Sequence, residues 1–149
     1  MKERRVVITG MGIVSPVGSR LDDAWQNVRD GVSGIRLIDD FDTSTFPTRI
    51  GGTVRDFSAD DYMSVKDQRK TDPFVHYGLA ASIDAIKDSG LDINEENGHT
   101  IGVAMGSGIG GIKTIEDNHN KMLNGGIRKV SPFFIPGSII NMTSGYVSI

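Results

Sequence analysis

The order of apolar and polar positions along the chain predicts buried strands that alternate with amphipathic helices. Short apolar runs at residues 5–9 (RVVIT) and 101–105 (IGVAM) are typical of buried strands, and glycines follow each run. A helical pattern follows each glycine turn. This order of strand, glycine turn and helix, found twice, favours a layered α/β structure with a largely parallel sheet.

Start and stop signals predict the helices. The first begins at Ser19, where Asp22 completes a capping box, and it ends at Gly31. Its apolar positions follow the spacing of one helix face: Leu21, Trp25 and Val28.

Three further helices are predicted. A Ser-x-x-Asp box starts a short one at residues 64–70, and Asp72-Pro73 starts a long one that ends at Gly90. The fourth covers residues 112–123. Between the first two helices, residues 35–56 are expected to form loop with a hairpin. The long helix carries an apolar stripe: Val75, Leu79, Ile83 and Ile86.

Composition narrows the class of protein. The 149 residues are the size of one domain, and 38% hydrophobic and 23% charged residues are globular values. A net charge of −3 argues against a general nucleic-acid binder. With no Cys there is no disulfide and no thiol nucleophile in these residues. No run approaches the roughly 18 apolar residues of a membrane span, nor is there a signal peptide, so a cytoplasmic protein without a membrane partner is expected.

Two glycine turns invite a comparison with nucleotide-binding loops. Residues 10–12 (GMG) lie between a strand and a helix, but Ser15 stands where a dinucleotide fingerprint needs its third glycine. A tight turn that packs a helix on a sheet is the alternative. Residues 106–111 (GSGIGG) lack the Gly-Lys-Ser/Thr ending of a phosphate loop. Within them, Ile109 is either a mobile plug at a pocket or a core residue.

Basic residues gather at two places in this acidic chain. Lys66, Arg69 and Lys70 are spaced i, i+3, i+4 and so share one helix face, and Arg128 and Lys129 would add to the same patch. Such a patch either steers an acidic partner or is a solvated basic face.

The final segment, residues 130–149, has no charged residue and no His. A surface with so little charge must be covered by more chain or by another subunit. The polypeptide is therefore expected to be the N-terminal part of a larger unit. The three histidines lack metal-ligand spacing, so no metal site is expected and surface or half-buried positions are predicted: His76, His99 and His119.

Several blocks together resemble the β-ketoacyl-acyl carrier protein synthases, and among them the type II group (KAS II). They are residues 4–18 (RRVVITGMGIVSPVG), 66–78 (KDQRKTDPFVHYG), the GSGIGG turn and 124–149 (NGGIRKVSPFFIPGSIINMTSGYVSI). The resemblance implies a homodimer with a thiolase-like, layered α/β/α/β/α fold made of two similar halves. Residues 1–149 would be most of the first half, ending before the catalytic Cys.

The family's reaction belongs to fatty-acid biosynthesis. The resemblance implies an acyltransferase that condenses an acyl chain, held on a Cys, with malonyl-acyl carrier protein in a decarboxylative Claisen reaction. The Cys, two His and a Lys are expected beyond Ile149, so no catalytic residue lies in this chain, which alone is predicted to be inactive. No cofactor is implied beyond the phosphopantetheine of the carrier protein.

The resemblance also implies roles in substrate binding and docking for particular residues of this chain. Ile109 would gate the acyl pocket, and Phe134 would line the partner subunit's pocket across the dimer interface. Acyl carrier protein would dock on the basic residues, which are Lys66, Arg69, Lys70, Arg128 and Lys129. Three alternatives remain open at this point: a non-catalytic fragment that keeps the dimer and carrier-protein surfaces, a Rossmann-type nucleotide binder, and a degradative thiolase.

Overall fold

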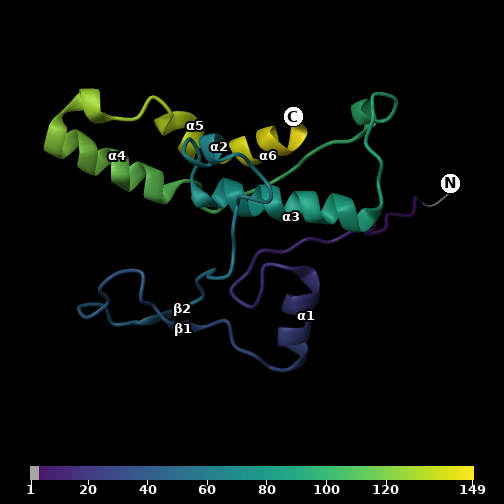
Figure 1. The fold of residues 1–149 in the computed structure, drawn as a ribbon, viewed down its shortest axis with the longest axis horizontal. Helices are drawn as coiled ribbons and strands as arrows, with labels where there is room; N and C mark the ends of the chain where they lie inside the picture. Colours follow the sequence, from purple (N-terminus) through teal and green to yellow (C-terminus); the bar gives the residue numbers. More distant parts are fainter. Residues whose placement is uncertain (1–3) are drawn as a thin grey trace.

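The computed structural model describes residues 4–149 and is arranged around one long helix, α3 (Pro73–Ser89). In Figure 1, α4 (Ile112–Gly125) continues the line of α3 beyond its first turn, while α2, α5 and α6 lie along one side and the N-terminal elements along the other. The remaining elements are α1 (Leu21–Arg29), β1 (Arg36–Leu37), β2 (Ile50–Gly51), α2 (Val65–Gln68), η1 (Gly98–Thr100), η2 (Ile127–Lys129), α5 (Phe134–Ser138) and α6 (Met142–Ser148).

The predicted boundaries of α3 are confirmed. The Asp72 carboxylate accepts a hydrogen bond from the Phe74 backbone N–H at the N-cap, and Pro occupies the first turn. Gly90 ends the helix in the left-handed conformation, with φ of 65°. Along the predicted stripe, Val75 and Leu79 are buried, whereas the two isoleucines nearer the C-terminal end are half-buried.

Asp72 also joins α3 to two other helices. Its second carboxylate oxygen accepts from the Thr114 backbone N–H of α4 at 2.9 Å, and its own backbone N–H donates to the Gly137 carbonyl of α5 at 3.3 Å. The residue is only 5% exposed. A buried carboxylate is stable only when hydrogen-bonded, so the amides at the starts of two helices and this carboxylate depend on each other.

A second buried polar residue, Asn118, holds the final segment to α4. Its side-chain oxygen accepts from the Ser131 N–H at 2.7 Å, and its amide donates to the Thr114 carbonyl at 2.8 Å. Farther along, α6 packs on α3, where Thr143 is buried against Gly78. A Cβ at Gly78 would overlap the Thr143 methyl group, so this close packing needs a glycine.

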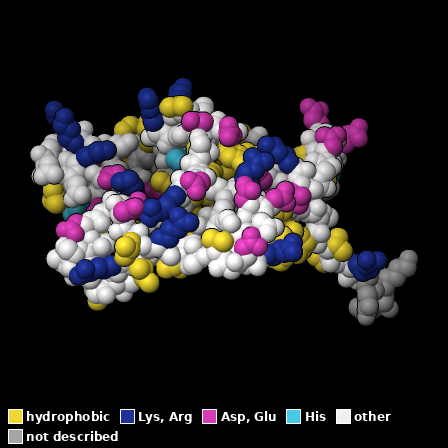
Figure 2. All heavy atoms as spheres, turned by 60° about the horizontal axis from the view of Figure 1, so that its bottom comes forward, with side chains coloured by type: hydrophobic (Ala, Val, Ile, Leu, Met, Phe, Trp, Pro, Cys, Tyr) yellow, Lys and Arg dark blue, Asp and Glu magenta, His cyan; other side chains and the backbone are white. Residues whose placement is uncertain are grey.

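The buried apolar core of the described residues is small, and many large apolar side chains reach the surface. On the face drawn in Figure 2, hydrophobic side chains lie between Lys, Arg, Asp and Glu side chains. No helix within residues 4–149 has the length and apolar character that crossing a membrane requires. The buried apolar residues are Ala24, Ala59, Val75, Leu79 and Ala80.

The prediction for the first helix was wrong in two respects. Arg20, not Ser19, is the N-cap of α1, and no side chain caps it. Trp25 and Val28, expected on a buried face, are 62% and 54% exposed. The helix instead packs through its small residue Ala24, against which the backbone of Gly18 lies closely. The apolar period located the helix but not its contact face, because close backbone approach selected a different side.

The two predicted strands form no β-ladder within residues 4–149. Residues 5–9 and 101–105 have no assigned secondary structure, and Val6 is 95% exposed. A strand needs a hydrogen-bonded neighbour, and neither segment pairs with another in the described part of the chain. The strands that do pair are β1 and β2, which are antiparallel, and they form the expected hairpin between residues 35 and 56.

The other two predicted helices are present, although α2 ends at Gln68 rather than at residue 70 and α4 extends to Gly125 rather than to residue 123. Ser64 caps α2, because its hydroxyl accepts from the Asp67 backbone N–H at 3.2 Å. Helix α4 begins at Ile112, as predicted, and its C-cap is Gly126, whose φ is 80°. Local signals of capping and glycine termination therefore define these elements well.

Replacing Asp72 with Ala should lower the free energy of unfolding by about 2 kcal/mol, because the α3 cap is lost and the Thr114 amide is left without its acceptor. Asp72→Asn should cost less, since an amide oxygen still accepts one bond. Urea unfolding followed by circular dichroism measures both changes. Asp92→Ala is the matched control, because that exposed side chain makes no hydrogen bond within residues 4–149. Equal stability of the Asp72 and Asp92 variants would contradict the role given to Asp72.

Candidate functional site

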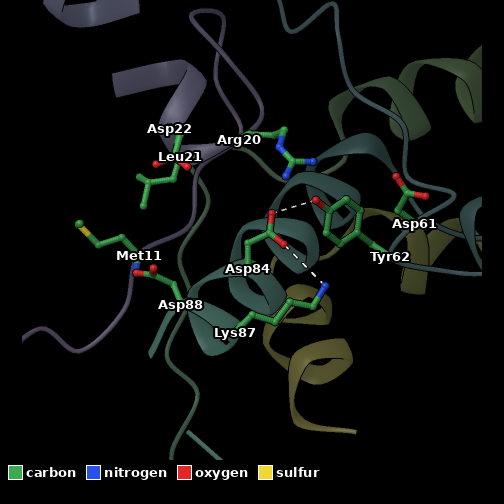
Figure 3. A pocket seen from close by; sticks show the side chains of 9 residues that line it. All are labelled: Met11, Arg20, Leu21, Asp22, Asp61, Tyr62, Asp84, Lys87 and Asp88. Atoms are coloured by element: carbon green, nitrogen blue, oxygen red, sulfur yellow. Dashed lines mark hydrogen bonds and ion pairs between the residues drawn. The ribbon is translucent and has the colours of Figure 1, made fainter. Parts of the chain in front are cut away.

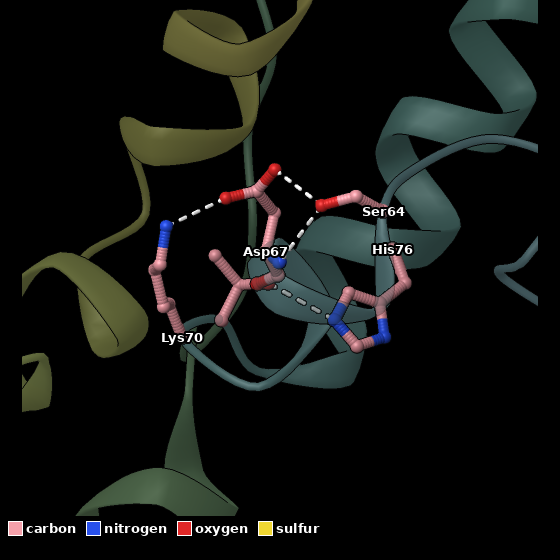
Figure 4. Close-up of polar contacts among 5 residues, drawn as sticks. Ser64, Asp67, Lys70 and His76 are labelled. Carbon is pink, nitrogen blue, oxygen red and sulfur yellow. Dashed lines mark hydrogen bonds and ion pairs between the residues drawn. The ribbon is translucent and has the colours of Figure 1, made fainter.

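Of the three cations predicted to share a helix face, Lys66 lies in α2 and Arg69 and Lys70 directly follow it, and they are of two kinds. Lys66 and Arg69 are exposed and form no ion pair with another described residue. Lys70 is half-buried: its ammonium lies 2.7 Å from the Asp67 carboxylate and 5.7 Å from the centre of the Phe133 ring. Figure 4 shows Lys70 directed at Asp67, which Ser64 also contacts. Lys70 thus has an internal partner, while the other two face solvent.

Hydrogen bonds keep the Asp67 carboxylate charged. The Lys70 ammonium is the main cause of a lowered Asp67 pKa, and the Ser64 hydroxyl, which donates at 2.7 Å, adds to it. The charged carboxylate in turn fixes the position of Lys70. The end of α2 is therefore a small, ordered polar network.

His76 of α3 lies beside this network and is half-buried. The Thr71 hydroxyl donates its hydrogen to the Asp67 carbonyl at 2.9 Å. Its oxygen lies 3.0 Å from His76 Nε2 and, with its hydrogen already used, accepts a hydrogen bond from that nitrogen. His76 Nε2 therefore carries a proton and donates it to the Thr71 hydroxyl oxygen. Burial lowers the His76 pKa below its ordinary value of 6.5, and the neighbouring hydrogen bonds and Asp72 only partly oppose this. His99 and His119 are exposed.

The second basic group lies at the far end of α4. Arg128 and Lys129 belong to η2, which packs against α4, and both are exposed. The stem of Lys129 lies across Gly125, where a Cβ would be 2.6 Å from the lysine Cγ. The two basic groups predicted from sequence thus lie apart, one in and directly after α2 and the other in η2.

The glycine turn at residues 106–111 brings Ile109 close to the helix that carries Phe134. Ile109 is 68% exposed at the turn, so it is not a core residue. The Gly111 N–H donates to the Ser138 carbonyl of α5 at 2.9 Å. Gly110, with φ of 81°, also lies against Ser138, where a Cβ would be 2.6 Å from the carbonyl oxygen. Phe134, half-buried, begins α5.

The other glycine turn, residues 10–12, packs on α3. A Cβ at Gly12 would overlap the carbonyl oxygen of Ala81, so the turn needs a glycine for close packing. The Met11 N–H donates to the Asp88 carboxylate at 2.8 Å. Helix backbone and a carboxylate thus lie where a nucleotide phosphate would bind, which speaks against the Rossmann alternative.

Sequence reasoning missed a polar cleft of about 380 Å³ next to this turn. Figure 3 shows the Tyr62 hydroxyl and the Lys87 ammonium both directed at Asp84, at 2.8 Å and 4.0 Å. Burial, followed by the hydrogen bond and charge of Asp84, raises the Tyr62 pKa. Two of its carboxylates are engaged, Asp84 by Tyr62 and Lys87 and Asp88 by the Met11 N–H. Its residues come from four separate segments, so no local pattern signals it.

Several solved structures with the same fold are ketosynthases. The chain superposes on the ishigamide ketosynthase/chain length factor with a TM-score of 0.80 and 25% identity, over 97% of this chain and 36% of that one. A β-ketoacyl synthase from Burkholderia phymatum gives 0.77 and 28%, over 98% and 36%. A type II polyketide ketosynthase in complex with its acyl carrier protein gives 0.79 and 25%, over 98% and 38%. The expected thiolase-like fold is confirmed, and this chain covers its N-terminal part.

Residues 3–149 match the family model of the β-ketoacyl synthase N-terminal domain, and the chain belongs to that family. It is 53% identical over 149 residues to 3-oxoacyl-[acyl-carrier-protein] synthase 2 of Vibrio cholerae, covering 100% of this chain and 36% of the relative. The protein of that name in Staphylococcus aureus is 43% identical over 148 residues, covering 99% and 36%. The chain thus spans 36% of the length of these curated relatives.

The lowered His76 pKa predicts a pH-dependent stability. Well above pH 6.5 the imidazole is neutral in both the folded and the unfolded state. As the pH falls below 6.5, the unfolded state takes up the proton first, so stability should decrease towards the folded-state pKa. Urea unfolding between about pH 7.5 and 5.5 measures this slope. His76→Gln should reduce it, and the exposed His119→Gln should leave it unchanged. An identical slope for His76→Gln would refute the assignment.

Proposed function

We propose that the protein carrying these residues is a type II 3-oxoacyl-acyl carrier protein synthase, an acyltransferase of fatty-acid elongation. The 53% identity to a synthase of that name over all 149 residues is the observation that carries the proposal. The ketosynthase fold gives independent support. The match extends over all 149 residues, which makes a distant fold relationship a poor explanation.

The proposed reaction is a decarboxylative Claisen condensation. A Cys thiolate attacks the acyl thioester of the carrier protein, which releases the carrier thiol and forms an acyl-Cys. Malonyl carrier protein then loses carbon dioxide, and the resulting carbanion attacks the acyl carbonyl, which frees the Cys thiolate and leaves a 3-oxoacyl carrier protein. A helix N-terminus that lowers the thiol pKa suits the first step, and hydrogen-bond donors to the thioester oxygen suit the second.

The chemistry itself is proposed to lie outside these 149 residues, which contain no Cys. No metal or resident cofactor is needed, because decarboxylation generates the carbanion and the substrate is carried on phosphopantetheine. Taken alone, the 149 residues would be a non-catalytic unit that keeps binding surfaces. An assay for 3-oxoacyl carrier protein distinguishes a complete synthase from a non-catalytic unit. Both would bind the carrier protein, but only a protein with the catalytic Cys would form the product.

The described residues would contribute binding and assembly. Ile109, exposed on its glycine turn, suits a gate at the acyl pocket, and its turn is hydrogen-bonded to the helix that Phe134 begins. A homodimer is proposed because apolar side chains of the uncharged final segment reach the surface, among them Ile135 at 57% and Ile140 at 47% exposed. Interfaces are poor in charge and rich in aromatic residues at their centre. The proposed location is the cytoplasm, with the carrier protein.

The first test of this function is carrier-protein binding. Charge reversal at two exposed positions, Lys66→Glu with Arg69→Glu, should weaken binding of acyl carrier protein about tenfold or more at low salt, because an acidic partner loses its attraction. Fluorescence titration of the full-length protein measures the dissociation constant. Undiminished binding would place the docking surface elsewhere.

The second test concerns acyl chain length. Ile109→Phe in the full-length protein should greatly reduce condensation of long acyl chains and spare short ones, because a larger side chain fills the entrance to the pocket. Ile109→Val is the matched control and should turn over both. Turnover numbers with short and long acyl carrier protein substrates decide the question, and equal loss for both lengths would argue against a gate.

A further inference from the structure

A third element joins the two basic groups that the sequence placed on α2 and on η2. Lys121 of α4 lines a cleft of about 210 Å³ together with Arg69 and Lys70. The same residue lines a neighbouring depression together with Lys129. Lys121 thus lies between the two groups and is exposed.

The charges around the first cleft leave two cations without an internal partner. Its carboxylates are already engaged: Asp72 accepts backbone amides of α3 and α4, and Asp117 lies 3.3 Å from Lys113. Lys70 is paired with Asp67 beside the cleft. Of the cations that line it, Arg69 and Lys121 form no ion pair within residues 4–149. Two unpaired cations facing one cleft favour an anion between them.

We propose that Lys121 is a docking residue for acyl carrier protein, and that it connects Lys66 and Arg69 with Arg128 and Lys129 into one continuous surface. The inference rests on the proposed function and deepens it. The ligands are carboxylates on the surface of the carrier protein rather than the phosphate of its prosthetic group. A basic surface that extends over two depressions requires several anions spaced along it, and a single phosphate cannot reach them all.

Lys70 is given a different role on this surface. Because its ammonium is held by Asp67 and lies over the Phe133 ring, it positions the cleft wall and contributes less to docking than Arg69 or Lys121. The prediction from spacing alone treated Lys66, Arg69 and Lys70 as equivalent.

The experiment compares variants of the full-length protein for binding of acyl carrier protein. Lys121→Glu should weaken binding about tenfold at low salt, and the factor should shrink at about 0.5 M salt. Arg29→Glu is the matched control: it makes the same charge change on α1, on the other side of α3, and should leave binding unchanged. Circular dichroism and thermal unfolding verify folding, and Lys121→Gln, which removes one charge only, should give a smaller loss.

Binding of the apo and holo carrier proteins by these variants tests the role of Lys121 separately from the proposed function. Equal weakening for apo carrier protein, which lacks the prosthetic group, and for the holo form supports docking to surface carboxylates. Weakening confined to the holo form would overturn that assignment in favour of the phosphate. If Lys66→Glu with Arg69→Glu weakens binding and both Lys121 variants do not, the inference fails while the proposed function stands. If the unsubstituted protein does not bind the carrier, the proposed function fails as well.

Discussion

One buried carboxylate, that of Asp72, organises the described part of the molecule. It accepts an amide at the start of α3 and another in the first turn of α4, while its backbone bonds to α5. Because α2 ends just before it and the GSGIGG turn runs directly into α4, this single residue sets the basic helix and the glycine turn side by side. A low local dielectric strengthens each of these hydrogen bonds and raises the cost of losing any of them.

Close backbone contact is the second constraint, and it explains where the glycines lie. Gly110 and Gly111 approach Ser138 of α5, and Gly137 approaches the Lys70 carbonyl at the end of α2. Side chains at these positions would push the three segments apart. The proposed acyl gate and the proposed docking surface are therefore supported by the same packed backbone, although their side chains come from distant parts of the sequence.

Capping residues and glycine stops located α2, α3 and α4 because these signals act within a few residues. The burial of α1 was not predictable in this way, since Ala24 rather than Trp25 contacts its neighbours. Spacing found Lys66 and Arg69, but it could not distinguish Lys70, whose partners depend on the local fold around Asp67 and Phe133. Lys121 was missed because only long-range packing brings it to Arg69. The family resemblance identified the class of protein, while the roles of Lys70 and Lys121 could be recognised only from the three-dimensional structure.

The unpaired apolar segment at residues 5–9 has a consequence for the life of the protein in the cell. Helices α4, α5 and α6 contact neighbours that are close in sequence, so they can assemble early, whereas residues 5–9 have no strand partner within residues 4–149. Val6, Val7 and Ile8 therefore expose both their side chains and an open backbone edge. While this segment is unpaired, its apolar side chains and open backbone favour pairing between molecules, the route to aggregation that chaperones suppress.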